Sequence, residues 1–318
     1  MKLSFANFPL EYIPDFPLND KNVLGIIREC GFTCTDYNIT LAHLDENWET
    51  RANKLKATLA DLGMSAPQAH APIVNPFDPG DVDYMDIYEK SLRFCKIAGI
   101  PMVVIHAGAI KDNTREEYFE KNVAFYRSLI PAAEETGVEV LIENIGHDGD
   151  ANFLLRGTDV REMADLVDHP LFNICWDTGH GNLNKQNLYD TIITLGDKLH
   201  ALHVHDNVGY FEPSYRHHRI DMHTMPYATQ YASVNYDALI QGLIDIGYKG
   251  TFNFEVLTVT RSIRPAFTYN GEVVRKLEFP SLELWKKANT LVYDIGKYML
   301  EAYGLYEGYR PQKNTKHR

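Results

Sequence analysis

Several short motifs in this 318-residue chain combine histidines with carboxylates, the side chains that bind divalent cations in proteins. Each such residue ends a short run typical of a β-strand or follows one within three residues. The residues are His70, His106, Glu143, Asp177, His180, His203, His205 and Glu255. A buried carboxylate costs several kcal/mol unless it is paired or bound to a metal. Three acids gathered with several imidazoles therefore indicate a metal site.

The donor types also narrow the choice of metal. A mixed set of imidazoles and carboxylates without a thiolate favours Mn²⁺, Mg²⁺, Co²⁺ or Zn²⁺ over softer metals, and we expect Mn²⁺ first. A single histidine at the end of a strand is more often an ordinary structural group. Here six of the eight predicted strands end in such residues, which favours the functional interpretation.

The elements that carry these residues alternate between short strands and longer helices. The predicted strands span residues 2–6, 32–37, 65–70, 101–106, 138–143, 172–177, 199–205 and 250–256. The predicted helices span residues 17–30, 48–62, 83–98, 115–136, 158–168, 236–246 and 281–303. Five of them are followed by glycines that suit a left-handed cap, namely Gly31, Gly63, Gly99, Gly137 and Gly247. Eight βα units predict an α/β fold, a (β/α)8 TIM barrel whose strand ends share one mouth.

Alternation along the predicted strands supports this placement. In the run NICWD, Cys175 and Asp177 point into the barrel, whereas Ile174 and Trp176 point toward the helices. The same alternation directs Glu255 toward the barrel axis. The predicted metal ligands therefore lie on the inner side of the strands.

No linker or change of composition divides the chain, so we expect a single domain over residues 1–318. The barrel should occupy about residues 1–256, and residues 257–318 should form a C-terminal extension with the last helix. An extended loop is expected after the seventh strand, at about residues 206–234. Both additions should lie near the active face or an interface.

Charge and composition exclude several classes of protein. Lys and Arg number 31 against 43 Asp and Glu, which gives a net charge of −12 and makes nucleic-acid binding unlikely. The four cysteines are too few for a disulfide framework. No signal peptide or membrane span is recognisable, so we expect a cytoplasmic protein that binds no membrane.

The motifs, taken in order, resemble the xylose isomerase-like superfamily, which includes sugar phosphate isomerases and epimerases and the endonuclease IV group. The resemblance rests on HAP (70–72), IHAG (105–108), IEN (142–144), WDTGH (176–180), HVHDN (203–207), DMHTMP (221–226) and FEV (254–256). It covers roughly residues 1–256.

The resemblance implies particular ligands. In the sugar epimerases one metal is held by residues that match Glu143, Asp177, His203 and Glu255. Endonuclease IV holds three zinc ions, and its further ligands match His70, His106, His180, Asp221 and His223. These five residues are either ligands of a second and third metal or groups that bind substrate hydroxyls around a single ion. His205 shares the inward parity of His203 and is a further candidate for substrate contact.

The resemblance also implies a mechanism for an enzyme of carbohydrate metabolism. The substrate would be a keto sugar or its phosphate, and Glu143 and Glu255 would remove and return a proton through an enediolate. His147, in the loop after the fifth strand, is a possible additional acid or base.

Other functions remain open from the sequence. A lyase or dehydratase similar to inosose dehydratases, or to the α subunits of C-glycoside deglycosidases that act on 3-keto-glycosides, would use the same site. A nuclease similar to endonuclease IV is less favoured because of the net charge. We expect a homo-oligomer, and a small partner subunit is possible.

Overall fold

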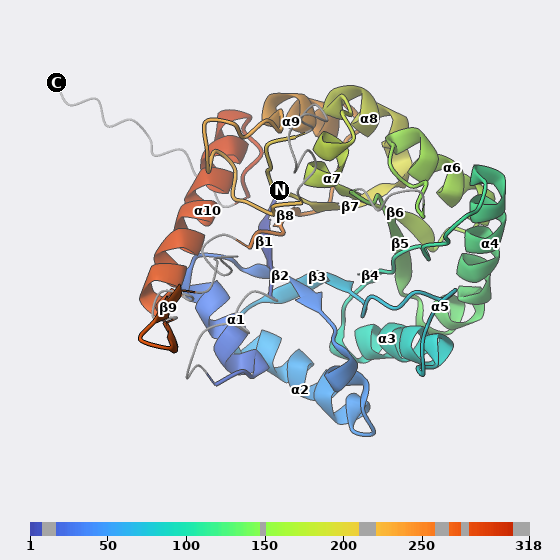
Figure 1. The fold of residues 1–318 in the computed structure, drawn as a ribbon, viewed down its shortest axis with the longest axis horizontal. Helices are drawn as coiled ribbons and strands as arrows, with labels where there is room; N and C mark the ends of the chain where they lie inside the picture. Colours follow the sequence, from blue (N-terminus) through green and yellow to red (C-terminus); the bar gives the residue numbers. More distant parts are fainter. Residues whose placement is uncertain (8–16, 147–150, 210–220, 258–266, 275–279, 308–318) are drawn as a thin grey trace.

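The computed structural model describes residues 1–318 except 8–16, 147–150, 210–220, 258–266, 275–279 and 308–318. Eight parallel strands follow one another around a barrel in the order β7-β6-β5-β4-β3-β2-β1-β8 (Figure 1). Their bounds are β1 Leu3–Ala6, β2 Cys34–Asn38, β3 Ser65–His70, β4 Met102–Val104, β5 Glu139–Glu143, β6 Phe172–Asp177, β7 Leu199–His203 and β8 Phe252–Phe254. The predicted TIM barrel is confirmed.

The barrel closes between its first and last strands in the order above. Val204 donates its N–H to the Asn253 carbonyl at 2.8 Å, and Glu255 donates its N–H to the Val204 carbonyl at 3.0 Å. These bonds lie at the C-terminal ends of β7 and β8, so they hold the strand ends that carry His203 and Glu255 next to each other.

Helices surround the barrel (Figure 1). Their bounds are α1 Asp20–Glu29, α2 Trp48–Asp61, α3 Tyr84–Ala98, α4 Arg115–Ser128, α5 Ile130–Thr136, α6 Gly157–Val167, α7 Thr178–Leu183, α8 Leu188–Leu195, α9 Tyr236–Asp245 and α10 Leu282–Ala302, with short 3-10 helices η2 Leu41–Leu44 and η3 Gly196–Lys198. The five glycines predicted to end helices all have positive φ angles. None of the helices in the described ranges combines the length and apolar character of a bilayer span.

Local signals explain where individual helices begin and end. The Asp83 carboxylate accepts hydrogen bonds from the Met85 and Asp86 N–H groups at the start of α3, and Gly99 ends this helix at φ 81°. The helix predicted over 115–136 is wrong as a single element. It divides at Leu129 into α4 and α5, because Pro131 lies in the first turn of α5 and cannot continue a helix from before it.

The last helix, α10, packs against the outside of the barrel. A Cβ atom on Gly296 of α10 would lie 2.5 Å from the Phe254 ring and 2.9 Å from the Leu3 side chain, so α10 packs closely on β8 and β1. The Trp285 ring meets Phe5 edge to face at 6.2 Å. A hairpin of β9 Phe267–Tyr269 and β10 Glu272–Val274 precedes this helix.

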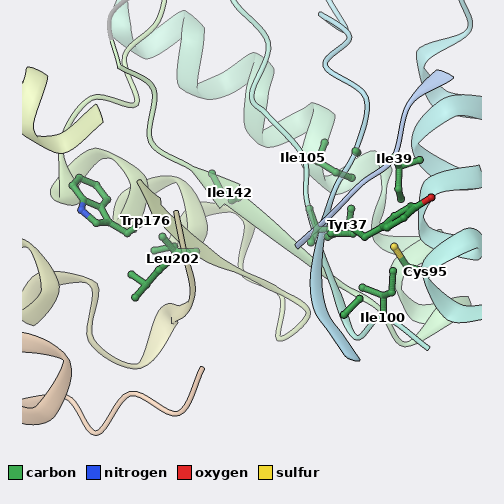
Figure 2. Packing of buried hydrophobic residues seen from close by; sticks show 14 of the residues in the cluster. Tyr37, Ile39, Cys95, Ile100, Ile105, Ile142, Trp176 and Leu202 are labelled. Carbon is green, nitrogen blue, oxygen red and sulfur yellow. The ribbon is translucent and has the colours of Figure 1, made fainter. Parts of the chain in front are cut away.

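The side chains of the strands alternate as predicted. Cys175 belongs to a small cluster inside the barrel with Val104, Leu141 and Ala201. Trp176 belongs to the large apolar layer between strands and helices, part of which appears in Figure 2. One apolar cluster therefore packs between the strands and the helices, and a smaller one fills part of the barrel interior. The C-terminal end of the interior is left to polar side chains.

Candidate metal centre

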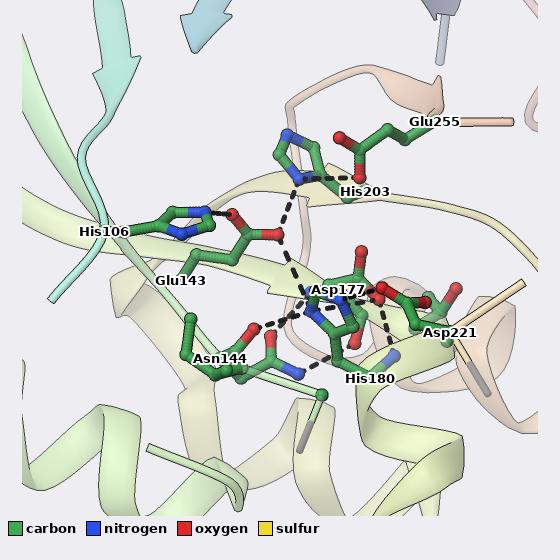
Figure 3. A network of polar contacts seen from close by, with 12 residues as sticks. His106, Glu143, Asn144, Asp177, His180, His203, Asp221 and Glu255 are labelled. Atoms are coloured by element: carbon green, nitrogen blue, oxygen red, sulfur yellow. Dashed lines mark hydrogen bonds and ion pairs between the residues drawn. The ribbon is translucent and has the colours of Figure 1, made fainter. Parts of the chain in front are cut away.

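Four predicted ligands meet at the C-terminal mouth of the barrel. Glu143, Asp177 and His203 are the last residues of β5, β6 and β7, and Glu255 follows β8 directly. One ligand atom from each lies within 4.8 Å of the others. Glu143, Asp177 and His203 are buried, and the Glu255 side chain is 13 % exposed. Figure 3 shows these side chains converging from separate strands.

The orientation of His203 is determined by contacts on both sides of its ring. Nδ1 lies 2.7 Å from Glu143 Oε1 and 3.3 Å from Glu255 Oε2. Nε2 lies 2.9 Å from Asp36 Oδ2. Without a metal both ring nitrogens face carboxylates, so the metal-free ring carries a proton on each of them. When a cation binds, the carboxylate of Asp36 would keep the proton on Nε2 and leave the Nδ1 lone pair for the metal.

Asp36 is a further residue of this centre that the sequence analysis did not select. Its Oδ2 accepts hydrogen bonds from Gln68 Nε2 at 2.9 Å and from Asn253 Nδ2 at 3.0 Å, in addition to the contact with His203. Asp36 lies on β2 and is 2 % exposed. A carboxylate in the middle of an otherwise uncharged predicted strand was the available signal.

The donor set fits a divalent cation. Three carboxylates and one imidazole are oxygen and nitrogen ligands of the kind that Mn²⁺, Mg²⁺ and Zn²⁺ accept. Within the described residues, no lysine or arginine pairs with Glu143, Asp177 or Glu255, and histidines are their only ion-pair partners. Burial opposes the charge on Glu143, but His203, His106 and His70 hold its pKa well below the usual range. The three buried or nearly buried carboxylates of the site therefore need a positive charge to balance them, from protonated histidines or from a bound cation.

A second cluster adjoins Glu143 through its other oxygen. His106 Nε2 lies 2.8 Å from Glu143 Oε2, and His70 Nε2 lies 3.0 Å from His106 Nε2. His70 Nδ1 lies 2.7 Å from the Ala71 carbonyl, to which it donates, so that Nε2 is left as the free nitrogen. His70, His106 and Glu143 thus present three ligand atoms to one point.

A third cluster lies on the side of Asp177. Its members are His180, His205, Asp221 and His223. The Asp221 carboxylate lies 3.1 Å from His180 Nε2 and 2.8 Å from His223 Nε2.

The rings of the third cluster are held from behind. His180 Nδ1 lies 2.8 Å from the Asn144 carbonyl, and His223 Nδ1 lies 3.1 Å from the Glu255 carbonyl. The His205 ring stacks on His223 with centroids 3.8 Å apart. Backbone carbonyls thereby orient both Nε2 atoms toward Asp221, which is the arrangement that metal-binding histidines require.

Charges in the third cluster are strongly coupled to one another. Burial opposes a charge on His223, but the bond to Asp221 raises its pKa to about 9. Burial also opposes the charge on Asp221, yet His180 and His223 hold its pKa far below the usual range. The imidazolium rings of His180 and His223 both contact Asp221 Oδ2. A metal cation bound to this oxygen would neutralise the same negative charge.

All but one of the predicted site residues lie in this single centre. His147 falls outside the described residues. The sequence analysis also missed Asn144, whose amide bridges β5 to β6. Its Nδ2 donates to the Asp177 carbonyl at 2.9 Å, and its Oδ1 accepts from the Asp177 N–H at 2.7 Å.

A cavity of about 370 Å³ opens beside the centre, and we call it the inner cavity. Asp36, His70 and Glu255 line its side nearest the cluster, whereas Ile39 and Ile73 contribute to an apolar wall. This volume is in the range of small-molecule sites, roughly 300–1,000 Å³. A ligand here can reach Glu255 and His70 of the centre directly.

Comparison with known proteins now identifies the family. The sequence profile of the xylose isomerase-like TIM barrel family matches residues 24–277. This chain belongs to that family. The resemblance found in the motifs is thereby confirmed.

Solved structures with this barrel include D-psicose 3-epimerase from Clostridium cellulolyticum H10 with D-tagatose. Its TM-score is 0.70 at 17 % identity, over 94 % of this chain and 99 % of that one. The IolI protein with a bound zinc atom gives a TM-score of 0.67 at 18 % identity, over 94 % and 99 % of the two chains. At these identities the likeness establishes the fold.

One relative by sequence is the probable endonuclease 4 of Methanoculleus marisnigri. It is 31 % identical over 141 residues, which are 41 % of this chain and 47 % of that protein. The match therefore covers less than half of each chain.

Proposed function

We propose that this protein is a divalent-metal-dependent isomerase or epimerase that acts on a keto sugar. The observation that carries the proposal is the position of Glu143 and Glu255. They come from β5 and β8 and approach the same His203 nitrogen at 2.7 and 3.3 Å. Two carboxylates on different sides of one centre can remove a proton from one face of a carbon and return it to the other.

The residues that would hold the cation are Glu143, Asp177, His203 and Glu255, and Mn²⁺ is the metal we propose first. A bound cation of this kind supplies a Lewis acid that polarises the substrate carbonyl and so acidifies the adjacent C–H. The protein's own part is to hold the sugar in the inner cavity, to exclude water and to accept the proton on a carboxylate oxygen. Zn²⁺, Co²⁺ and Mg²⁺ are alternatives, and zinc in IolI supports such a site.

The inner cavity supports a neutral sugar over a sugar phosphate. Its lining within the described residues contains two carboxylates, Asp36 and Glu255, and no lysine or arginine. Phosphate recognition commonly uses arginine, lysine or a helix N-terminus. The sugar bound to D-psicose 3-epimerase in its solved structure is in keeping with this choice.

We further propose that the second and third clusters are additional metal sites or contact substrate hydroxyls. Both present two or more imidazole nitrogens with a shared carboxylate. Metal analysis distinguishes the two interpretations, because additional sites require more than one ion per chain. The prediction of a homo-oligomer, of a possible small partner subunit and of a cytoplasmic location stays a prediction.

Hydrogen exchange tests the proposal. Candidate ketoses incubated with the metal-loaded protein in D₂O should exchange one hydrogen next to the carbonyl, visible by proton NMR. Glu255→Gln should abolish the exchange while the fold is retained. Absence of exchange from every ketose tested would contradict the proposed reaction, and exchange accompanied by loss of water or of an aglycone would establish the lyase alternative.

A nuclease is the second candidate, because the three clusters together match the ligands expected from endonuclease IV. The net charge of −12 opposes duplex binding. Incubation of the metal-loaded protein with a DNA duplex that contains one abasic site distinguishes the nuclease from the sugar isomerase. Strand cleavage at catalytic rates would favour the nuclease over the sugar isomerase.

A further inference from the structure

A second cavity of about 480 Å³ lies at the same end of the barrel, and we call it the outer cavity. The segment after β3 lines both cavities. Ala71 and Ile73 face the inner cavity, and Asn75 and Phe77 face the outer one. Ile73 and Asn75 are two residues apart, so their Cα atoms are separated by at most about 7 Å. The two cavities are therefore neighbours.

An aromatic ring forms part of the outer cavity. Phe77 lines this cavity and is 37 % exposed. Its N–H donates to Asn75 Oδ1 at 3.1 Å, and Asn75 Nδ2 donates to the Ala109 carbonyl at 2.9 Å. A Cβ atom on Gly108 would lie 2.4 Å from the Phe77 ring, so the ring rests against bare backbone. The ring is thus fixed with part of its surface open.

Charged groups surround this ring. Asp78, Lys111 and Asp112 line the outer cavity. In the part of the chain that the structure describes, their side chains form no ion pair and no hydrogen bond. They are available to a ligand as acceptors and as a donor.

We propose that the outer cavity binds a second sugar ring, so that the substrate is a glycoside or disaccharide rather than a free monosaccharide. The C–H face of a pyranose packs on an aromatic ring, and its hydroxyls bond to carboxylates and an ammonium group around the rim. The keto ring then occupies the inner cavity at the carboxylates, and the glycosidic bond crosses the segment 73–75. The assignment of the keto ring rests on the proposed function.

Binding of methyl β-cellobioside to the full-length protein tests the outer cavity without turnover, because this probe has no free carbonyl. Isothermal titration calorimetry should show binding, weakened about five- to tenfold by Phe77→Ala. Phe77→Tyr should restore the affinity, since it keeps the ring. Phe267→Ala, at an exposed aromatic on β9, is the matched control and should leave binding unchanged.

Equal affinity of the wild type and Phe77→Ala, or no binding of the probe, would overturn the proposal. Hydrogen exchange, measured beside binding of the probe, distinguishes a failure of the outer-cavity proposal from a failure of the proposed function. If ketose exchange in D₂O proceeds while the probe does not bind, only the outer cavity is wrongly assigned. If the probe binds through Phe77 while neither a ketose nor a keto-disaccharide exchanges hydrogen, the sugar site stands and the proposed reaction fails. With a keto-disaccharide, Phe77→Ala should raise KM and leave kcat unchanged.

Discussion

Asp36 offers a sharp test of how the metal ligands are held. Three donors, from Gln68, His203 and Asn253, converge on its Oδ2 at 2.9 to 3.0 Å. Asp36→Asn keeps the shape and can keep an oxygen at this position, but it removes the negative charge that holds the Nε2 proton of His203. Loss of such a partner behind a metal ligand typically costs 10–100-fold in metal affinity.

The magnitudes for two variants follow from this geometry. Asp36→Asn retains neutral hydrogen bonds, which are roughly half as strong as charged ones, so its metal affinity should fall about tenfold, or ~1.4 kcal/mol. Asp36→Ala also leaves three donors without an acceptor, so the fall should approach about 100-fold. Asp197→Asn removes the same charge at an exposed position far along the chain and is the control.

Competition with a fluorescent chelator measures the affinity, and thermal denaturation of the metal-free variants measures the fold. Metal affinity of Asp36→Asn within twofold of wild type, beside a lowered melting temperature, would show that Asp36 supports only the barrel interior. That result would refute the assigned role in orienting His203.

Two further perturbations test the third cluster. The pKa of His223 is raised to about 9 by Asp221 despite burial, so its protonated form stabilises the metal-free protein fully below pH 6.5, and this stabilisation is lost as the pH rises toward 9. The melting temperature should fall over that interval, and His223→Gln should flatten the fall; an unchanged slope would contradict the coupling. Gly179→Ala places a Cβ 1.9 Å from the His205 ring, so the ring must move, and the free energy of unfolding should fall by about 1–3 kcal/mol. Gly25→Ala, in open space on α1, should be neutral or stabilising by up to about 1 kcal/mol, so similar melting temperatures for the two variants would show that His205 is not held against Gly179.

The sequence predicted the barrel and most of the centre for one physical reason. Parallel strands in a closed barrel bring their C-terminal ends to one mouth, so residues that end strands must meet. Glu143, Asp177 and His203 are terminal residues of their strands, and their convergence therefore needs no information about distant contacts.

The features that were missed depend on contacts or on weak local signals. The partners of Asp36 lie 32, 167 and 217 residues away, and no local pattern specifies them. Helices α7 and α8 were not predicted, because each is short and Gly179 and Gly181 lower the helix propensity of α7. The Asp177 side chain caps α7 by accepting the His180 N–H at 2.7 Å, which is a local structural role for a predicted ligand.

The metal content of the purified protein is the most direct test of the metal centre. Elemental analysis should find at least one divalent ion per chain, and Glu143→Ala should lose it. Glu143 belongs both to the four-ligand group with Asp177, His203 and Glu255 and to the second cluster with His70 and His106. A folded wild-type protein that binds no divalent ion, even after incubation with Mn²⁺, Zn²⁺, Co²⁺ and Mg²⁺, would contradict the account.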